Sequence, residues 1–178
     1  MLLTDRMELW LPQPGDLAEM HGLSEDKETR RYLGPEPDEM ADSFARLLRN
    51  SGSWNLYGYG NFILRLHGEA NIIGNCGVFR SFRGFGRGMD DVAEAGWIIA
   101  RALWGQGLAG EAMRAILAWF DTAHGPQRIT CMIERGNTTS ENLAHSLGFR
   151  AYGQHQPEDG GGALVFHERI IPEAVGAA

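Results

Sequence analysis

The chain has 178 residues, a formal net charge of −7 at pH 7 and 22% charged side chains. This length can bury a core, so we expect one domain over 1–173 and a flexible tail over 174–178. The acidic balance disfavours nucleic acid and anionic lipid as partners, and no apolar run approaches the ~20 residues of a membrane-spanning helix. The two cysteines, Cys76 and Cys131, are interpreted as reduced, buried thiols of a cytoplasmic protein.

The first half of the chain is predicted to alternate strands with short helices. The expected elements are a strand over 7–11, two helices capped by Asp16 and Ser24, a helix that starts at Pro37 and ends at 50–53, and strands over 59–66 and 70–79. In the helix after Pro37, an i, i+4, i+7, i+8 spacing indicates one apolar side formed by Met40, Phe44, Leu47 and Leu48. We expect that side to face the core.

The second half carries stronger signals. A strand over 91–99 is followed by a helix whose apolar stripe comprises Leu108, Ala112, Ala115, Ile116, Trp119 and Phe120. Gly125 and Pro126 are expected to end that helix. The remaining elements are predicted to be a strand over 129–133, a short helix over 140–147, and strands over 149–155 and 163–171.

A glycine-rich segment, Gly105–Gly110, opens the long helix. Its closely spaced glycines let the backbone turn tightly and expose its N–H groups, and the helix start adds the positive end of its dipole. Such a site binds an anion, most often a phosphate. The sequence therefore predicts a phosphorylated ligand at residues 105–110.

The same segment also matches G-x-G-x-x-G, the dinucleotide-binding pattern, which would indicate an oxidoreductase. The surrounding sequence fits that pattern poorly. Residues 100–104 separate the strand from the first glycine, and the position about 20 residues further on, where an acid is expected, is Gly125. A dinucleotide-binding oxidoreductase is therefore the less favoured alternative.

Four motifs, one of which includes the glycine-rich segment, resemble in order and spacing the motifs of the GNAT N-acetyltransferase superfamily. They are Glu94–Ile99 (E-x-G-[YW]-x-[LI]), Trp104–Ala112 (W-G-x-G-[YL]-A-x-E-A), Asn137–Ser140 (N-x-x-S) and Leu147–Phe149 (L-G-F). The most similar branch is the ribosomal-protein N-terminal acetyltransferase (Rim) type, whose opening T-x-R-L-x-L resembles Thr4–Leu9. The resemblance implies an α/β fold with a mixed, mostly antiparallel sheet flanked by helices. It also implies a splayed strand pair near Ile98 that admits the cofactor.

The resemblance further implies transfer of an acetyl group from acetyl-CoA to a primary amine by direct attack, without a metal. The acceptor would be a protein N-terminus or a small-molecule amine, and the protein a monomer or a homodimer. The implied cofactor contacts are the backbone of Ile98, Ile99 and Ala100 beside the pantetheine, the segment Trp104, Gly105, Gln106, Gly107, Leu108, Ala109 and Gly110 around the pyrophosphate, and the side chains of Asn137 and Ser140.

Two residues are candidates for catalysis. Ser140 can donate a hydrogen bond to the leaving thiolate, and this role gains weight because Ala144 replaces the tyrosine of many GNAT enzymes. Glu94 is a carboxylate in an apolar strand and is a candidate base for the amine. The alternatives are that Ser140 only caps its helix, and that Glu94 faces solvent or forms a salt bridge. A non-catalytic CoA-binding sensor is the alternative function.

Overall fold

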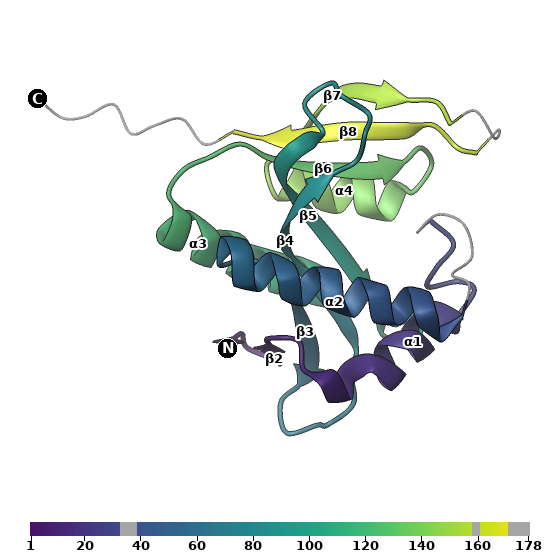
Figure 1. Ribbon diagram of the computed structural model, residues 1–178, viewed down its shortest axis with the longest axis vertical. Coiled ribbons are helices and arrows are strands. Elements are labelled where there is room, and N and C mark those ends of the chain that lie inside the picture. Colours follow the sequence, from purple (N-terminus) through teal and green to yellow (C-terminus); the bar gives the residue numbers. More distant parts are fainter. Residues whose placement is uncertain (33–38, 158–160, 171–178) are drawn as a thin grey trace, which may run out of the picture.

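The computed structural model describes residues 1–32, 39–157 and 161–170. Within these residues the chain forms an eight-stranded sheet in the order β1-β2-β3-β4-β5-β6-β8-β7 (Figure 1). The strands are β1 (Leu2–Leu3), β2 (Met7–Trp10), β3 (Asn61–Leu66), β4 (Gly74–Phe82), β5 (Asp90–Ile99), β6 (Ile129–Glu134), β7 (Arg150–His155) and β8 (Leu164–Arg169). All neighbouring strands are antiparallel except β5 and β6, which run parallel.

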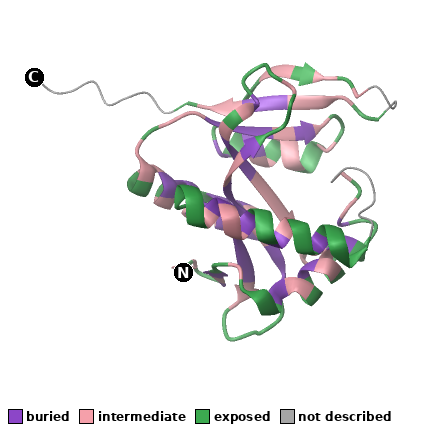
Figure 2. Ribbon diagram, in the orientation of Figure 1, coloured by how far each residue is buried: buried purple, intermediate pink, exposed green. Residues whose placement is uncertain are grey.

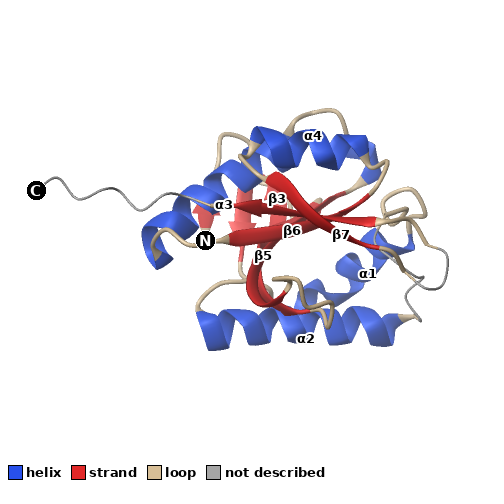
Figure 3. Ribbon diagram, turned by 90° about the horizontal axis from the view of Figure 1, so that it is seen from above, coloured by secondary structure: helices blue, strands red, loops and turns tan. Residues whose placement is uncertain are grey.

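Helices cover both faces of the sheet. They are α1 (Leu17–Glu25), α2 (Met40–Tyr57), α3 (Leu108–His124) and α4 (Thr138–Ser146), with short 3-10 turns at Pro14–Asp16 and Arg101–Leu103. Figure 3 shows α3 and α4 on one face and α1 and α2 on the other. Buried residues follow the central strands (Figure 2). The predicted fold class, a mixed and mostly antiparallel sheet flanked by helices, is confirmed. No helix in the described ranges is long and apolar enough to cross a membrane.

The long helix α3 forms where the apolar stripe predicts it. It begins at Leu108, after Gly107, and ends at His124, before Gly125. Most of the predicted stripe is buried, and Met113 and Leu117 widen it. This wide apolar side packs the helix against the sheet, because burial of such side chains contributes roughly 1.5–3 kcal/mol each.

The helix α2 differs from the prediction in both its end and its buried side. It continues past residues 50–53 to Tyr57. Its buried residues are Ser43, Leu47, Asn50 and Ser53, whereas Met40, Phe44 and Leu48 are about half exposed. The predicted core-facing side was therefore wrong except at Leu47. The predicted start at Pro37 and the tail over 174–178 lie outside the described residues.

Polar contacts explain why α2 turns this side inward. The amide of Asn50 donates to the Asn61 carbonyl oxygen at 2.9 Å and accepts from the Asn61 N–H at 2.7 Å. The hydroxyl of Ser53 donates to the Tyr59 carbonyl oxygen at 2.7 Å. These bonds satisfy backbone groups around the start of β3, which burial would otherwise penalise. Because polar side chains dock this side of the helix, its buried residues show no hydrophobic periodicity in the sequence.

Near the N-terminus, the predicted helix cap at Ser24 was wrong. Asp16 does precede α1, but Ser24 lies inside this helix and is buried. Its hydroxyl donates to the His21 carbonyl oxygen at 2.9 Å. A serine that bonds back to an earlier carbonyl continues a helix instead of starting one. The strand predicted over 70–79 is also displaced, because β4 begins only at Gly74 and extends to Phe82.

Candidate active site

The strands β5 and β6 pair for only a short distance. Their register joins Ala93 to Ile129 and Glu94 to Thr130, after which β5 continues to Ile99 with no further pairing to β6. On its other edge β5 stays paired with β4 as far as Ile99. The result is a gap between β5 and β6 whose narrow end is at Glu94. The predicted splay is present and begins before Ile98.

The turn at Gly105–Gly110 leads from this gap into α3. Gly105 and Gly107 have φ angles of +77° and +76°, a left-handed conformation that residues with a Cβ adopt only with strain. A Cβ on Gly107 would have the Arg6 guanidinium, 3.8 Å away, as its nearest neighbour, and one on Gly105 would meet nothing within 4 Å. Backbone conformation, not crowding, therefore requires glycine here. The turn exposes backbone N–H groups at a helix start, the arrangement that binds phosphate.

Arg6 holds this turn from a distant part of the chain. Its guanidinium donates to the Gln106 carbonyl oxygen at 2.8 Å and to the Glu111 carboxylate at 2.6 Å, and its backbone N–H donates to the same carboxylate at 2.9 Å. Burial alone would raise the pKa of Glu111, but hydrogen bonds from Thr4 and Arg6 outweigh it and lower that pKa. Arg6 was missed as a site residue, although it is the arginine of the T-x-R-L-x-L motif.

Trp104 closes the other end of the turn. Its indole N–H donates to the Ile99 carbonyl oxygen at 2.7 Å, and the Arg101 guanidinium lies 4.9 Å from the centre of its ring. The side chain therefore ties the turn to the end of β5. The Ala100 N–H is also engaged, because it donates to the Ile73 carbonyl oxygen at 2.8 Å. Two of the backbone groups of residues 98–100 that were predicted to face the pantetheine thus have partners within the protein.

The helix α4 presents Asn137 and Ser140 toward β5. Asn137 is the residue that caps α4, because its side-chain oxygen accepts from the Ser140 N–H at 3.2 Å. Ser140 is therefore not the cap. Its hydroxyl oxygen instead accepts from the indole N–H of Trp97 on β5 at 3.3 Å. Since that oxygen acts as an acceptor here, its own proton remains available for donation. Ala144 is fully buried one turn further along.

Glu94 lies at the narrow end of the gap, buried and paired. Its side chain is 4% exposed, and the Arg83 guanidinium donates to its two oxygens at 2.9 and 2.6 Å. Burial disfavours the charged form of Arg83, but the hydrogen bond and charge of Glu94 outweigh it and raise the pKa of Arg83. The structure therefore has the salt-bridged arrangement, through a partner that sequence patterns did not reveal. Arg83 follows β4, in a loop without periodicity.

Both cysteines are buried free thiols. Burial raises the pKa of Cys76 to about 12. Burial, and then the charge of Glu94, raise the pKa of Cys131, which follows the last residue of β6 that pairs with β5. Both thiols are thus neutral near pH 7, and neither has the thiolate character that a nucleophile needs.

The chain matches known acetyltransferases along most of its length. Residues 6–150 match the family model described as an acetyltransferase (GNAT) domain. The chain therefore belongs to the GNAT acetyltransferase family. Among curated proteins it is 27% identical over 153 residues to the uncharacterized N-acetyltransferase p20 of Bacillus licheniformis, across 85% of this chain and 83% of that protein.

Solved structures agree. A protein from Bordetella pertussis assigned to the GnaT acetyltransferase family is 33% identical, with a TM-score of 0.84 over 94% of this chain and 98% of that one. RimL, the ribosomal L7/L12 α-N-protein acetyltransferase solved in complex with coenzyme A, is 13% identical. Its TM-score is 0.77 over 97% of this chain and 98% of that one, a likeness of fold alone.

The family resemblance predicted from the motifs is thus confirmed, and the dinucleotide-binding alternative was wrong. The sheet is mostly antiparallel, and the turn at Arg101–Leu103 separates β5 from the first glycine. A dinucleotide fingerprint needs a parallel sheet and a strand that runs directly into that glycine. The roles of individual residues toward cofactor and acceptor stay predictions.

Proposed function

We propose that the protein transfers the acetyl group of acetyl-CoA to a primary amine, with the cofactor held in the gap between β5 and β6. One observation carries this proposal. The strand pairing ends at Glu94, and the glycine turn and the Ser140 hydroxyl both adjoin the part of β5 that is unpaired on this side. Anion donors and a hydroxyl therefore border one gap, as an acyl-thioester with a pyrophosphate requires.

On the cofactor side, the backbone N–H groups of residues 105–110 and the start of α3 would hold the pyrophosphate. Arg6 would act as a positioning residue, because it fixes the carbonyl between the two left-handed glycines. The pantetheine would lie along Ile98–Ala100. The side-chain nitrogen of Asn137 makes no hydrogen bond within the described ranges, so it is available to this arm.

In the reaction, the amine nitrogen attacks the thioester carbonyl carbon, the C–S bond breaks, and the amine loses a proton. The sulfur leaves as a thiolate, which a positioned donor stabilises. Ser140 would be that donor, with Trp97 fixing its hydroxyl. Glu94 is the candidate to orient the amine or to take its proton. Arg83 engages one lone pair of each carboxylate oxygen, so a proton from the amine would go to one of the remaining lone pairs.

A thiol-release assay tests the proposal. The protein is incubated with acetyl-CoA and a panel of protein N-terminal peptides, amino acids, polyamines and simple amines, and acetylated products are identified by mass. Reactions without amine correct for hydrolysis. We expect amine-dependent thiol release matched by acetylated product. Binding of acetyl-CoA without transfer to any amine would favour a CoA-binding sensor, and no binding at all would contradict the proposal.

A further inference from the structure

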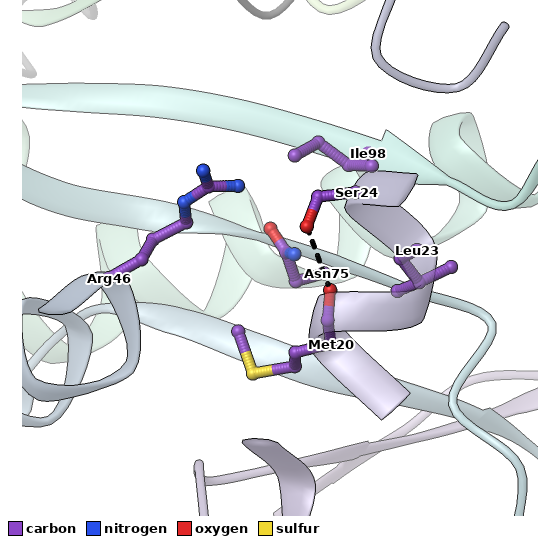
Figure 4. A pocket seen from close by; sticks show the side chains of 6 residues that line it. All are labelled: Met20, Leu23, Ser24, Arg46, Asn75 and Ile98. Atoms are coloured by element: carbon purple, nitrogen blue, oxygen red, sulfur yellow. Dashed lines mark hydrogen bonds between the residues drawn. The ribbon is translucent and has the colours of Figure 1, made fainter. Parts of the chain in front are cut away.

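A small cavity adjoins β5 and is lined by residues of α1 and α2. These two helices cover the face of the sheet opposite α4, the helix that carries Ser140 (Figure 3). The cavity's lining residues are Met20, Leu23, Ser24, Arg46, Asn75 and Ile98 (Figure 4). The cavity measures only about 10 Å³, about the space of one water, so an anionic group would bind at its mouth or displace the Arg46 side chain. Trp97 points toward α4, where its indole contacts Ser140. Because successive strand residues alternate faces, Ile98 points the other way, into this cavity. The cavity therefore borders the strand proposed to flank the pantetheine, on the opposite face of the sheet.

Two polar side chains in this cavity have unused hydrogen-bonding capacity. Arg46, from α2, and Asn75, from β4, are both half-buried. Across the described parts of the chain, neither the Arg46 guanidinium nor the Asn75 amide makes a side-chain hydrogen bond, and Arg46 forms no ion pair. Every other polar side chain of this lining is used: the Ser24 hydroxyl bonds to backbone carbonyls. No atom of the Arg46 or Asn75 side chain is both fully buried and unpaired, so water can reach these donors until an anion replaces it.

The charges around Arg46 also favour an anion. Burial, and then the nearby charge of Arg49, lower the pKa of Arg46, and Arg30 acts in the same direction. Asp42, one turn earlier on α2, opposes them. Among the described residues, Arg30 and Arg49 thus act on the Arg46 charge against Asp42. The guanidinium offers a planar pair of donors that matches the oxygens of a carboxylate or a phosphate.

The position suits the acceptor better than the cofactor. The glycine turn leads into α3, and Ser140 lies on α4, so the cofactor is served from the α3 and α4 face. An amine that attacks from the other face meets α1, α2 and the cavity beside Ile98. A groove of about 410 Å³ shares Leu23 with this cavity and extends to Ala100 and Arg101. Glu19 and Asp26 also line it, so this groove would suit the amine end of an acceptor and not its anionic group.

We propose that the acceptor amine carries an anionic group, a carboxylate or a phosphate, which Arg46 binds with help from Asn75. This inference rests on the proposed acetyl transfer and specifies its acceptor. It runs against the net charge of −7, which taken alone would favour a cationic acceptor. The local arrangement outweighs the net charge because contacts at hydrogen-bonding distance are far less screened than distant charges.

The test uses matched acceptors that keep the amine and differ in charge. The pairs are O-phosphoethanolamine with ethanolamine, and β-alanine with β-alaninamide. Each is assayed with wild type, Arg46→Ala, Arg46→Lys and the control Arg49→Ala, which removes an exposed arginine from the same helix. Comparing each variant with wild type on the same acceptor cancels differences in amine basicity. The pair that responds distinguishes phosphate from carboxylate.

We expect Arg46→Ala to lower kcat/KM for the anionic member of one pair by about 10- to 100-fold, the loss typical of a hydrogen bond to a charged group. The neutral member and the affinity for acetyl-CoA should change little. Arg46→Lys should restore part of the loss, because a lysine keeps the charge without the paired donors. Arg49→Ala removes a nearby charge but no side chain that lines the cavity, so it should lower kcat/KM for the anionic member less than Arg46→Ala does.

Calorimetric titration of the same anionic amines into CoA-saturated protein provides a readout that needs no turnover. Wild type should bind one of them and Arg46→Ala should not. Equal use of charged and neutral amines, unaltered by Arg46→Ala, would overturn the inference while leaving acetyl transfer intact. Failure of CoA-saturated wild type to bind either anion would also overturn it. Failure to transfer acetyl groups to any amine, neutral ones included, would contradict the proposed function instead.

Discussion

The two faces of the sheet differ in how polar side chains near strand β5 are hydrogen-bonded. On the α3 and α4 face, contacts within the protein fix the elements proposed to hold the cofactor: Arg6 binds Glu111 and the glycine turn, and Asn137 caps α4. On the α1 and α2 face, Arg46 and Asn75 have no side-chain hydrogen bonds within the described ranges. A preformed site binds at a lower entropic cost. We infer that the α3 and α4 face is preorganised to bind the cofactor. The α1 and α2 face would bind the acceptor, which determines specificity.

The strongest test of the preformed face is Gly107→Val. A β-branched residue is strained at a φ of +76° and would place its side chain beside the exposed N–H groups, so affinity for CoA should be lost. Titration calorimetry measures binding, and circular dichroism checks the fold. Gly58→Val is the matched control, because Gly58 has nearly the same backbone conformation as Gly107, φ 75° and ψ 7° against φ 76° and ψ 7°, at the end of α2. Normal CoA binding by Gly107→Val would place the pyrophosphate elsewhere.

Glu94 is the last residue of β5 that pairs with β6, and Glu94→Gln tests its chemistry. If the carboxylate is the base, kcat should fall by roughly 100-fold or more, and the acidic limb of the pH–rate profile should flatten. Arg83→Met breaks the same ion pair but keeps the carboxylate. It should lower the melting temperature while the acidic limb persists. An unchanged profile in Glu94→Gln would restrict Glu94 to a structural role.

Ser140→Ala separates catalysis from binding on the preformed face. Loss of one well-placed donor should lower kcat by about 100-fold, with little change in the dissociation constant of acetyl-CoA. Since Asn137 caps the helix, stability should be nearly unaltered. Ser146→Ala, which removes an exposed hydroxyl from the same helix, is the control. Full kcat in Ser140→Ala would require another donor for the thiolate.

Arg6→Ala tests whether the glycine turn needs its support. The affinity for CoA should fall by about 10-fold, because the pair with Glu111 is partly exposed and such ion pairs contribute modestly. The turnover number at saturating acetyl-CoA should hold. Glu111→Gln and the double variant complete a cycle in which the two losses should be less than additive. Unchanged affinity in Arg6→Ala would show that the turn is rigid without it.

The smallest expected effect concerns pH and stability at β8. His167 is buried; burial first, and then the charge of His145, lower its pKa, whereas the Val165 backbone and Glu141 oppose this. A depressed pKa contributes stability above the ordinary value of 6.5 that is lost as the pH falls through the folded-state value. The free energy of unfolding of wild type, measured with urea, should therefore be lower below pH 6.5 than at pH 7.5. His167→Gln should show a smaller difference. An equal loss of stability in wild type and His167→Gln would show that His167 does not cause this pH dependence.

The same contrast between the faces explains what could be predicted from the sequence. The glycine turn, α3 and the family were predictable because left-handed glycines and a wide apolar stripe leave local signatures. The inward side of α2 was not, because Asn50 and Ser53 dock it by hydrogen bonds to residues in and before β3. The Arg83 partner of Glu94 is eleven residues away in an irregular loop, and nothing in the spacing indicates it.

Arg6 is an intermediate case. It lies in a recognised motif, yet its function emerges only when the fold brings it to Glu111, 105 residues further along the chain. Arg46 belongs to no recognised motif. Its proposed role depends on the lack of a hydrogen-bond partner within the described residues, which only the fold reveals. Cofactor residues could therefore be proposed from local pattern, whereas acceptor residues required the arrangement of α1, α2 and β5.

A crystal structure of the protein with acetyl-CoA tests the central claim most directly. The account predicts the pyrophosphate within hydrogen-bonding distance of the backbone N–H groups of residues 105–110, and the thioester sulfur beside the Ser140 hydroxyl. The pantetheine should fill the gap between β5 and β6 beyond Glu94. A cofactor bound outside this gap, or a pyrophosphate away from the glycine turn, would contradict the account.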